Sequence, residues 1–189
     1  MQRRHFLIGS ALFTAGVAAG CTTTPQSAEG TAAKKKEINS GIDSTLSRLY
    51  TSAKGSRELV QKARGVLVFP SVLSAGLIVG GEYGEGALRV GGQTADYYKT
   101  TSGSFGWQAG AQSRALIFLF MTDDALKSFR ASDGFTVGAN ASVALLKIGA
   151  NGSIDTNTVK EPIVGFALTN SGLMAGLTLE GTKITKLKW

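Results

Sequence analysis

The side chains that could carry acid–base chemistry in this chain are carboxylates, because imidazole and thiol groups are almost absent. The chain of 189 residues has one histidine, His5, and one cysteine, Cys21. Beyond these first 21 residues, a Ser-His-Asp triad, a Cys-His pair and a histidine-ligated zinc site are therefore excluded. A single cysteine also excludes an internal disulfide. Catalysis would have to rest on carboxylates, lysine or tyrosine.

The strongest carboxylate candidates are Glu82, Glu85 and Asp96. Glu82 and Glu85 could form an acid–base pair. Three residues apart in an extended chain, they are instead expected on opposite faces of a solvated hairpin tip. The surrounding glycines, at 80–86, suggest a phosphate loop, but that motif needs a helix N-terminus directly after it. Because 87–90 reads as a strand, we expect no phosphate loop. Since imidazole and thiol groups are missing beyond residue 21 and Glu82 and Glu85 are expected at a solvated hairpin tip, we also expect no cofactor, no metal site and no enzymatic activity.

The first 21 residues have the layout of an export signal. Arg3 and Arg4 precede an apolar run at 6–19, which is shorter than the roughly 20 residues of a membrane span. The small residues before Cys21 resemble a bacterial lipobox, in which the cysteine is acylated, and the paired arginines resemble a twin-arginine signal. An ordinary cleaved signal with a chance cysteine is the alternative. We expect a lipoprotein of the bacterial envelope, anchored at Cys21 in the outer membrane and facing the periplasm.

Removal of residues 1–20 leaves a basic chain whose formal charge falls from +7 to +5. Residues 21–37 are rich in small and polar residues and predict a flexible, lipid-anchored tether. It ends close to Lys34, Lys35 and Lys36, which either strengthen attachment to anionic headgroups or keep a solvated linker soluble. An exported chain makes nucleic acid an unexpected partner.

Two helices are expected to open the folded domain, which we place at 38–189. Apolar residues at spacings of four and three predict the first helix; they are Ile38, Ile42, Leu46, Leu49 and Ala53. Few cations lie on its opposite face, so docking on the core is favoured over a membrane-surface helix. Gly55 ends this helix, and Ser56 is expected to cap a second, short one.

Short strands with regularly spaced turns follow. We expect them at 65–70, 77–83, 87–90, 95–100, 105–111, 115–121, 135–145, 163–169, 173–179 and 183–187. Pro70 is expected to stop the first strand, residues 84–86 to form a hairpin turn, and Thr122 to cap one internal helix. The predicted fold is mainly β (α+β): an antiparallel barrel-like or sandwich sheet of eight or more short strands, with one or two N-terminal helices and one internal helix packed on it.

Several glycine-containing segments, spread over 38–188, resemble the SYLF domain family, specifically its bacterial lipoprotein branch. They are GVLVFP at 65–70, AGLIVGG at 75–81, GEG at 84–86, SFGWQAG at 104–110, and GLMAGL at 172–177 with LEG at 179–181. Eukaryotic SYLF domains are associated with phosphoinositide and membrane binding, and with actin binding, and are not known as enzymes. The resemblance implies non-catalytic binding to lipid or protein.

The first functional hypothesis is binding to anionic phospholipid at a membrane surface. The cations expected to supply the attraction flank the predicted helices; they are Lys34, Lys35, Lys36, Lys54, Arg57, Lys62 and Arg64. The alternative is a protein-interaction or scaffold module in the cell envelope that uses an exposed strand edge such as 183–187. The lysines of that strand could instead protect a sheet edge from pairing.

Overall fold

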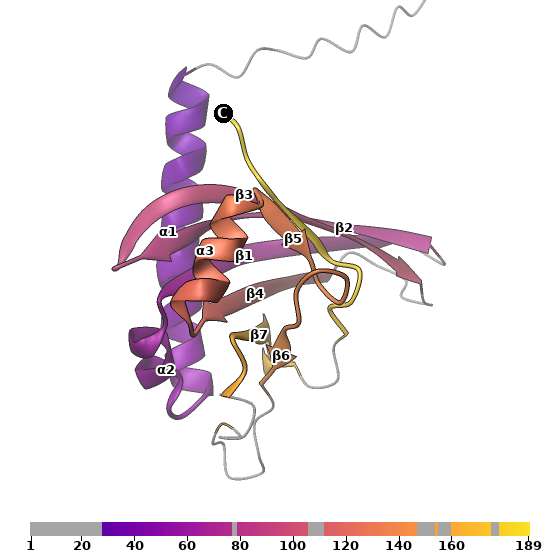
Figure 1. The fold of residues 1–189 in the computed structure, drawn as a ribbon. Coiled ribbons are helices and arrows are strands. Elements are labelled where there is room, and N and C mark those ends of the chain that lie inside the picture. The colour runs from indigo at the N-terminus through magenta and orange to yellow at the C-terminus, as the bar shows by residue number, and fades with distance from the viewer. Residues whose placement is uncertain (1–27, 77–78, 106–111, 147–153, 155–159, 175–177) are drawn as a thin grey trace, which may run out of the picture.

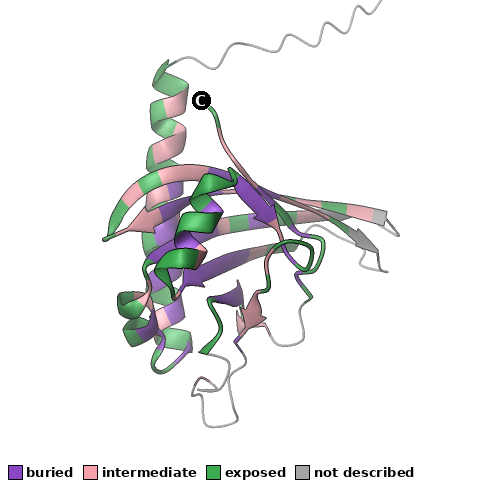
Figure 2. Cartoon of the chain, in the orientation of Figure 1, coloured by how far each residue is buried: buried purple, intermediate pink, exposed green. Residues whose placement is uncertain are grey.

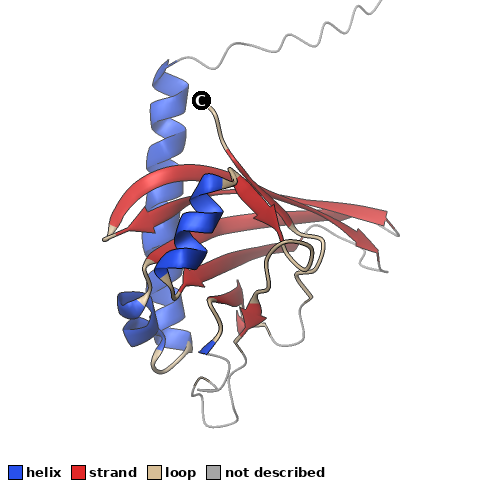
Figure 3. Ribbon diagram, viewed as in Figure 1, coloured by secondary structure: helices blue, strands red, loops and turns tan. Residues whose placement is uncertain are grey.

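The structure, a computed structural model, describes residues 28–76, 79–105, 112–146, 154, 160–174 and 178–189. Within these residues it contains three helices and nine strands (Figures 1 and 3). The helices are α1 (Ala28–Ser52), α2 (Ser56–Lys62) and α3 (Asp123–Ala131). The strands are β1 (Gly65–Gly76), β2 (Val79–Val90), β3 (Gln93–Phe105), β4 (Gln112–Phe120), β5 (Gly134–Thr136), β6 (Ala144–Leu145), β7 (Ile163–Thr169), β8 (Gly172–Leu173) and β9 (Lys183–Lys186).

The strands form one curled sheet with the shape of a half-barrel. Its order is β5-β9-β3-β2-β1-β4-β7-β6, and β8 pairs with β7. All pairings between these strands are antiparallel except the short parallel contact of β6 with β7. The predicted fold class, a mainly β half-closed sheet with packed helices, is confirmed.

Two hydrophobic cores lie on opposite faces of this sheet, because successive side chains of a strand alternate in direction. On the outer face, α1 packs against residues such as Val68, Ile117 and Phe166. On the inner face, α3 and the curled strands β5 and β9 enclose an aromatic core; its members include Phe69, Phe118, Phe120, Phe129 and Phe135. Figure 2 shows the buried residues concentrated where the helices cover the sheet.

A bulge in β1 near Pro70 organises this packing. The register of β1 shifts between Val68 and Ser71 against β2, so Pro70 bends the strand without ending it, contrary to the prediction. Three glycines leave room for this bend because they have no Cβ atom. A Cβ at Gly41 of α1 would lie 2.8 Å from the Pro70 ring, and a Cβ at Gly84 would lie 2.8 Å from the Ser71 carbonyl oxygen. A Cβ at Gly86 would collide with the Val68 carbonyl oxygen.

Beyond the bulge, β1 to β4 continue as an extension of the sheet (Figure 1). We call residues 71–74, 81–85, 99–103 and 112–114 the arm. We call the segments of β1 to β4 on the other side of the bulge, at 65–69, 86–90, 93–98 and 115–120, the packed half. Strand β2 runs straight through 84–86, so the predicted hairpin turn there is wrong. The turn between β2 and β3 instead uses Gly91 and Gly92, whose φ angles are +59° and +81°.

Helix α1 begins at Ala28, ten residues before the start expected from its apolar face. The segment 28–37, predicted as part of a flexible tether, is helical because alanine, lysine and glutamate dominate it. Its early turns are mostly exposed and project past the sheet (Figure 1). Ser56 is no cap: it is buried, and its hydroxyl donates to the carbonyl oxygens of Leu49 and Ala53. Gly55, in the left-handed conformation, is the N-cap.

Some of the other helix and strand predictions are confirmed and others are corrected, while the strand predicted at 105–111 lies, apart from Phe105, outside the described residues. Thr122 caps α3, accepting a 3.2 Å hydrogen bond from the Ala125 amide. The hairpin about 170–172 is present as β7 and β8. The long strand predicted at 135–145 is wrong, because Gly138, with φ +83°, turns the chain between β5 and β6. Strand β9 lies between β3 and β5 and is therefore not the sheet edge predicted for 183–187.

Candidate functional site

The seven cations predicted to bind lipid lie in two clusters at opposite ends of α1. Lys34, Lys35 and Lys36 belong to its N-terminal half, whereas Lys54 and α2 follow its C-terminal end. At 1.5 Å per residue, the 34–36 and 54–64 clusters are separated by about 25–30 Å along the helix axis. The structure therefore does not bring the predicted cations together on one surface.

Within the N-terminal cluster, two lysines are engaged by their own chain. The Lys34 ammonium lies 3.2 Å from a Glu85 carboxylate oxygen and 3.4 Å from Glu37. Its hydrogen bond with Glu85 is the main reason that the pKa of Lys34 is raised. The Lys35 ammonium sits 5.5 Å from the Tyr97 ring centroid and 5.7 Å from that of Trp189, a double cation–π contact. Lys36 is exposed.

The second cluster is similarly divided. The Arg57 guanidinium stacks 4.4 Å from the Tyr50 ring centroid, and Arg64 lies 3.5 Å from an Asp123 carboxylate oxygen. Lys54 and Lys62 are exposed, and among the described residues neither has an ion pair. Cys21 and the proposed export signal lie outside the described residues.

The three candidate catalytic carboxylates are held in separate ion pairs. Glu82 lies on the inner face, where it bonds the Arg114 guanidinium and accepts a 2.7 Å hydrogen bond from the Ser102 hydroxyl. Glu85 lies on the outer face with Lys34, as the alternation of an extended strand predicted, although not at a hairpin tip.

Asp96 lies 2.7 Å from the Lys186 ammonium and 3.8 Å from Arg130. The described residues contain no cluster of three or more His, Cys, Asp or Glu side chains that could hold a metal ion. Each candidate carboxylate thus neutralises a neighbouring cation rather than facing another acid.

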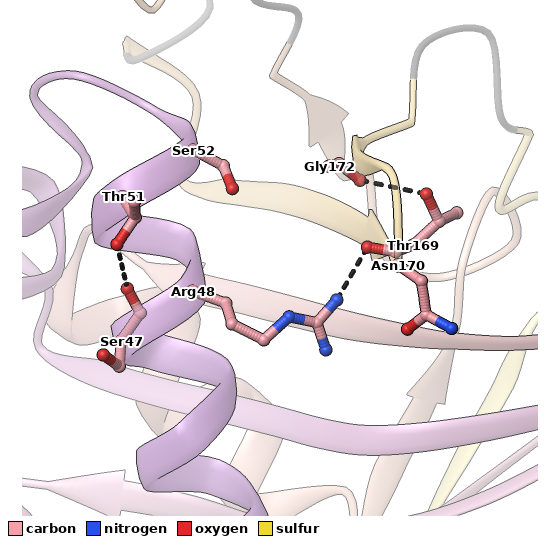
Figure 4. Close-up of a pocket in the computed structure, with 7 residues that line it drawn as sticks. All are labelled: Ser47, Arg48, Thr51, Ser52, Thr169, Asn170 and Gly172. Carbon is pink, nitrogen blue, oxygen red and sulfur yellow. Dashed lines mark hydrogen bonds between the residues drawn. The ribbon is translucent and has the colours of Figure 1, made fainter.

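Two other cavities are lined entirely by described residues. One, of about 300 Å³, is formed between α1 and the β7–β8 turn (Figure 4). Arg48 crosses it and donates a 2.6 Å hydrogen bond to the Thr169 carbonyl oxygen, while Ser47, Thr51 and Asn170 supply polar walls. The other cavity, of about 590 Å³, opens beside α3 over Phe129 and Phe135.

The outer face of the arm carries the two most exposed large apolar side chains of the described residues. Leu73 is 55% exposed and Tyr83 is 46% exposed, and they are direct cross-strand neighbours on β1 and β2. Next to them, Gly81 of β2 pairs with Gly103 of β3. The Tyr83 hydroxyl donates a 2.7 Å hydrogen bond to Glu85. Partial burial, and then this hydrogen bond, raise the pKa of Tyr83 to about 12.

The strands expected from the sequence did not predict this surface. Ending the first strand at Pro70 left Leu73 outside any strand, and placing a hairpin at 84–86 took Tyr83 away from the neighbours it has in the structure. The available signal was the alternation in β2, which places Gly81, Tyr83 and Glu85 on one face of an extended strand.

Comparison with known proteins finds a family that the chain resembles. The family model described as "Ysc84: Las17-binding protein actin regulator" matches residues 101–188, from within β3 to just past β9. Over these residues the chain is similar to this family, the SYLF domain family. The predicted resemblance is therefore confirmed.

Curated relatives of this chain come from two strains of Saccharomyces cerevisiae, YJM789 and ATCC 204508 / S288c. Both are named LAS seventeen-binding protein 3, and each is 28% identical over 134 residues. The alignment covers 67% of this chain but only 29% of each relative, so the chain corresponds to less than a third of the yeast proteins. Among the described helices, none has the length and apolar character needed to cross a bilayer.

Proposed function

We propose that this chain is a non-catalytic module that binds a protein partner through the outer face of the arm. The observation that carries the proposal is the adjacent exposure of Leu73 and Tyr83, 55% and 46%, beside two glycines. Scattered single apolar residues are normal on a surface, but a contiguous group of them marks an interaction site. Helices α1 and α2 pack on the outer face of the packed half and leave this group uncovered.

The comparisons support a protein partner. The yeast relatives are named for binding LAS seventeen, and the family description is that of an actin regulator. Each of the carboxylates considered for catalysis forms an ion pair with a cation of its own chain. These ion pairs support a non-catalytic role.

The proposal is tested by crosslinking in envelopes of cells that produce the full-length protein, followed by identification and purification of the crosslinked protein. We expect the purified pair to associate at high salt and without lipid. Combined Leu73→Ser and Tyr83→Ser substitutions should weaken that association at least tenfold. Trp189→Ser is the matched control, because Trp189 is also 42% exposed but lies against Tyr97, away from the arm. Equal binding by the arm variant and the unaltered protein would refute the proposal.

A second candidate function, binding of anionic phospholipid, is favoured by the exposed lysines Lys36, Lys54 and Lys62. The distance of about 25–30 Å between their clusters exceeds the Debye length of roughly 8–10 Å at physiological salt. The two clusters would therefore act independently on a charged surface, not as one patch.

The proposed envelope location predicts which of the two lysine clusters would lie near the membrane. If Cys21 is acylated in the outer membrane, the seven steps from Cys21 to Ala28 can span at most about 25 Å. The N-terminal end of α1, with Lys36, would then face the bilayer, and Lys54 and Lys62 would lie farther from it. Intact-mass analysis of the membrane-extracted protein tests the acylation directly.

Vesicle flotation of the full-length Cys21→Ser protein tests the lipid hypothesis without the anchor. We expect recovery with anionic vesicles to exceed recovery with neutral ones, and Lys36→Gln to reduce it more than Lys54→Gln combined with Lys62→Gln. Equal recovery with neutral and anionic vesicles would rule out electrostatic lipid binding.

A further inference from the structure

Gly81 and Gly103 have no packing reason to be glycine. A Cβ built at either position meets no atom within 4 Å, and neither residue has the positive φ that favours glycine. A glycine inside a strand costs about 0.5–1 kcal/mol relative to alanine. Glycines in strands often mark places where another backbone or a ligand approaches closely. These two face each other across β2 and β3 and form a flat floor on the outer face of the arm.

Side chains of the neighbouring pairs stand beside this floor. Tyr83 and Thr101 form the next pair along β2 and β3, and Leu73 lies across from Tyr83 on β1. The charged side chains on this face are close to side chains of opposite charge. Glu85 forms an ion pair with Lys34, and Lys99 lies opposite Glu85 in the β2–β3 register. The apolar side chains of Leu73 and Tyr83 stand beside the Gly81–Gly103 floor, and the nearby charges are balanced. Such a surface suits an uncharged partner and attracts an anionic partner only weakly.

Next to the same floor, part of the outer edge of β3 has no partner strand among the described residues. Strand β9 pairs with β3 only from Tyr98 to Thr101, and the chain before Lys183 turns away at Gly181, whose φ is +80°. At 102–105, β3 therefore pairs with β2 on one side and, among the described residues, has no strand on the other. Unpaired backbone N–H and C=O groups of such an edge are a template for an added strand.

We propose that the arm binds a short extended segment of a protein partner, which adds to the β3 edge at 102–105 and places apolar side chains on the Gly81–Gly103 floor against Tyr83. The inference rests on the proposed function and specifies its mode of binding. Four strands at about 4.8 Å spacing and four to five residues at about 3.4 Å give a face of about 300 Å². A standard interface buries about 800 Å² per partner, so this face fits a peptide segment better than a second folded copy of the chain.

The test uses a phage-displayed library of random 12-residue peptides, panned against the full-length protein. Selected peptides are labelled, and their dissociation constants are measured by fluorescence polarisation. We expect alternating apolar sequences, and at least tenfold weaker binding to Gly103→Thr and to Gly81→Thr. A Cβ at either position meets no atom within 4 Å, and a threonine side chain there would occupy the floor. Ala95→Thr is the matched control on the same strand and should bind the peptides unchanged.

Hydrogen exchange supplies the second measurement. Peptide binding should slow amide exchange at 102–105 and leave the interior strand β1 unaffected. Peptides that lose affinity for Tyr83→Ser but not for Gly103→Thr, with no protection at 102–105, would overturn the strand-addition mode while leaving the proposed function intact. Failure to select any peptide would also overturn it. So would a dimer abolished by Gly103→Thr, or binding to vesicles abolished by Tyr83→Ser, because the occupant would then be a second copy or a lipid surface.

Discussion

The glycines of the packed half and those of the arm are present for different reasons. Gly84, at the boundary, and Gly86 lie under the β1 bulge, where a Cβ would meet the backbone of Ser71 or Val68. Gly81 and Gly103, a few residues farther along the same strands, face open space. The first pair is required by the fold, whereas the second lowers strand stability without any contact that needs it. The composition of a glycine-rich strand therefore does not reveal which glycines are structural.

The two faces of the arm differ in the same way. On the inner face, Glu82 and Arg114 are an ion pair with side chains 8% and 14% exposed, and the buried Arg114 Nε has no hydrogen-bond partner within the described part of the chain. On the outer face, Leu73 and Tyr83 are exposed. Polar groups are thus buried on one side and apolar groups exposed on the other, the reverse of the usual distribution. This inversion distinguishes the arm from the packed half.

Removing the buried carboxylate should have the largest effect. Glu82→Ala leaves the Arg114 guanidinium buried without its counter-charge, and we expect a loss of about 3–5 kcal/mol of unfolding free energy. Asp43→Ala is the control, because it removes an ion pair with Arg89 in which Asp43 is 69% exposed, so a loss of at most about 1 kcal/mol is expected. Urea denaturation of both variants measures the difference. Similar losses would show that the Glu82 pair is not energetically buried.

The second prediction concerns the glycines themselves. Gly86→Ala places a Cβ against the Val68 carbonyl oxygen, and such overpacking costs about 1–3 kcal/mol. Gly81→Ala is the matched substitution in the same strand and should not destabilise. Thermal and urea unfolding of the two variants test this contrast. If Gly86→Ala were as stable as Gly81→Ala, the β1 bulge would have to relax without cost, and the structural role given to Gly86 would be wrong.

Two tyrosines allow a third comparison, since each has a pKa raised to about 12, mainly by burial. The Tyr83 hydroxyl in the arm is bonded to Glu85, whereas the Tyr98 hydroxyl in the packed half is buried and has no hydrogen-bond partner among the described residues. Removal of an unpaired buried hydroxyl should stabilise, so Tyr98→Phe is expected to gain about 1 kcal/mol at neutral pH.

The same substitution predicts a pH dependence. A tyrosine pKa near 10 in the unfolded chain and near 12 in the folded one means that the folded state binds more protons between these pH values. Stability is unaffected below pH 10 and falls as the pH rises from 10 to 12. Urea titrations across this range should show a shallower decline for Tyr98→Phe than for the unaltered protein. Parallel declines would show that Tyr98 ionises in the folded state as readily as in the unfolded one.

How far the sequence predicted this molecule depended on whether the controlling interactions were local. The cap at Thr122, the strand at 115–121 and the apolar face of α1 follow from neighbouring residues, and all three were predictable. Pro70 was predicted to end a strand because its local effect is disruptive. In the structure, Gly41 of α1 and Gly86 of β2, distant in sequence, accommodate the bend.

The candidate site depends even more strongly on contacts between residues that are distant in sequence. Lys34 and Lys54 both belonged to one predicted cationic set, but α1 is longer than its apolar face indicates and holds them apart. Leu73 and Tyr83 become neighbours only through the β1–β2 register, and Gly103 reaches Gly81 only through the β2–β3 register. Both registers continue past the bulge, which the local sequence does not predict.

The smallest expected change in stability is that of Gly103→Thr, which completes the comparison of the two glycine pairs. Gly103→Thr introduces a β-branched residue at a position with open space, and removing the strand glycine should raise the unfolding free energy by about 0.5 kcal/mol. The same substitution is expected to weaken peptide binding at least tenfold, so stability and binding should change in opposite directions. Denaturant midpoints and peptide dissociation constants measured on one preparation test both. A destabilised Gly103→Thr would mean that the floor is shaped by the fold, as Gly86 is, and not kept open for a partner.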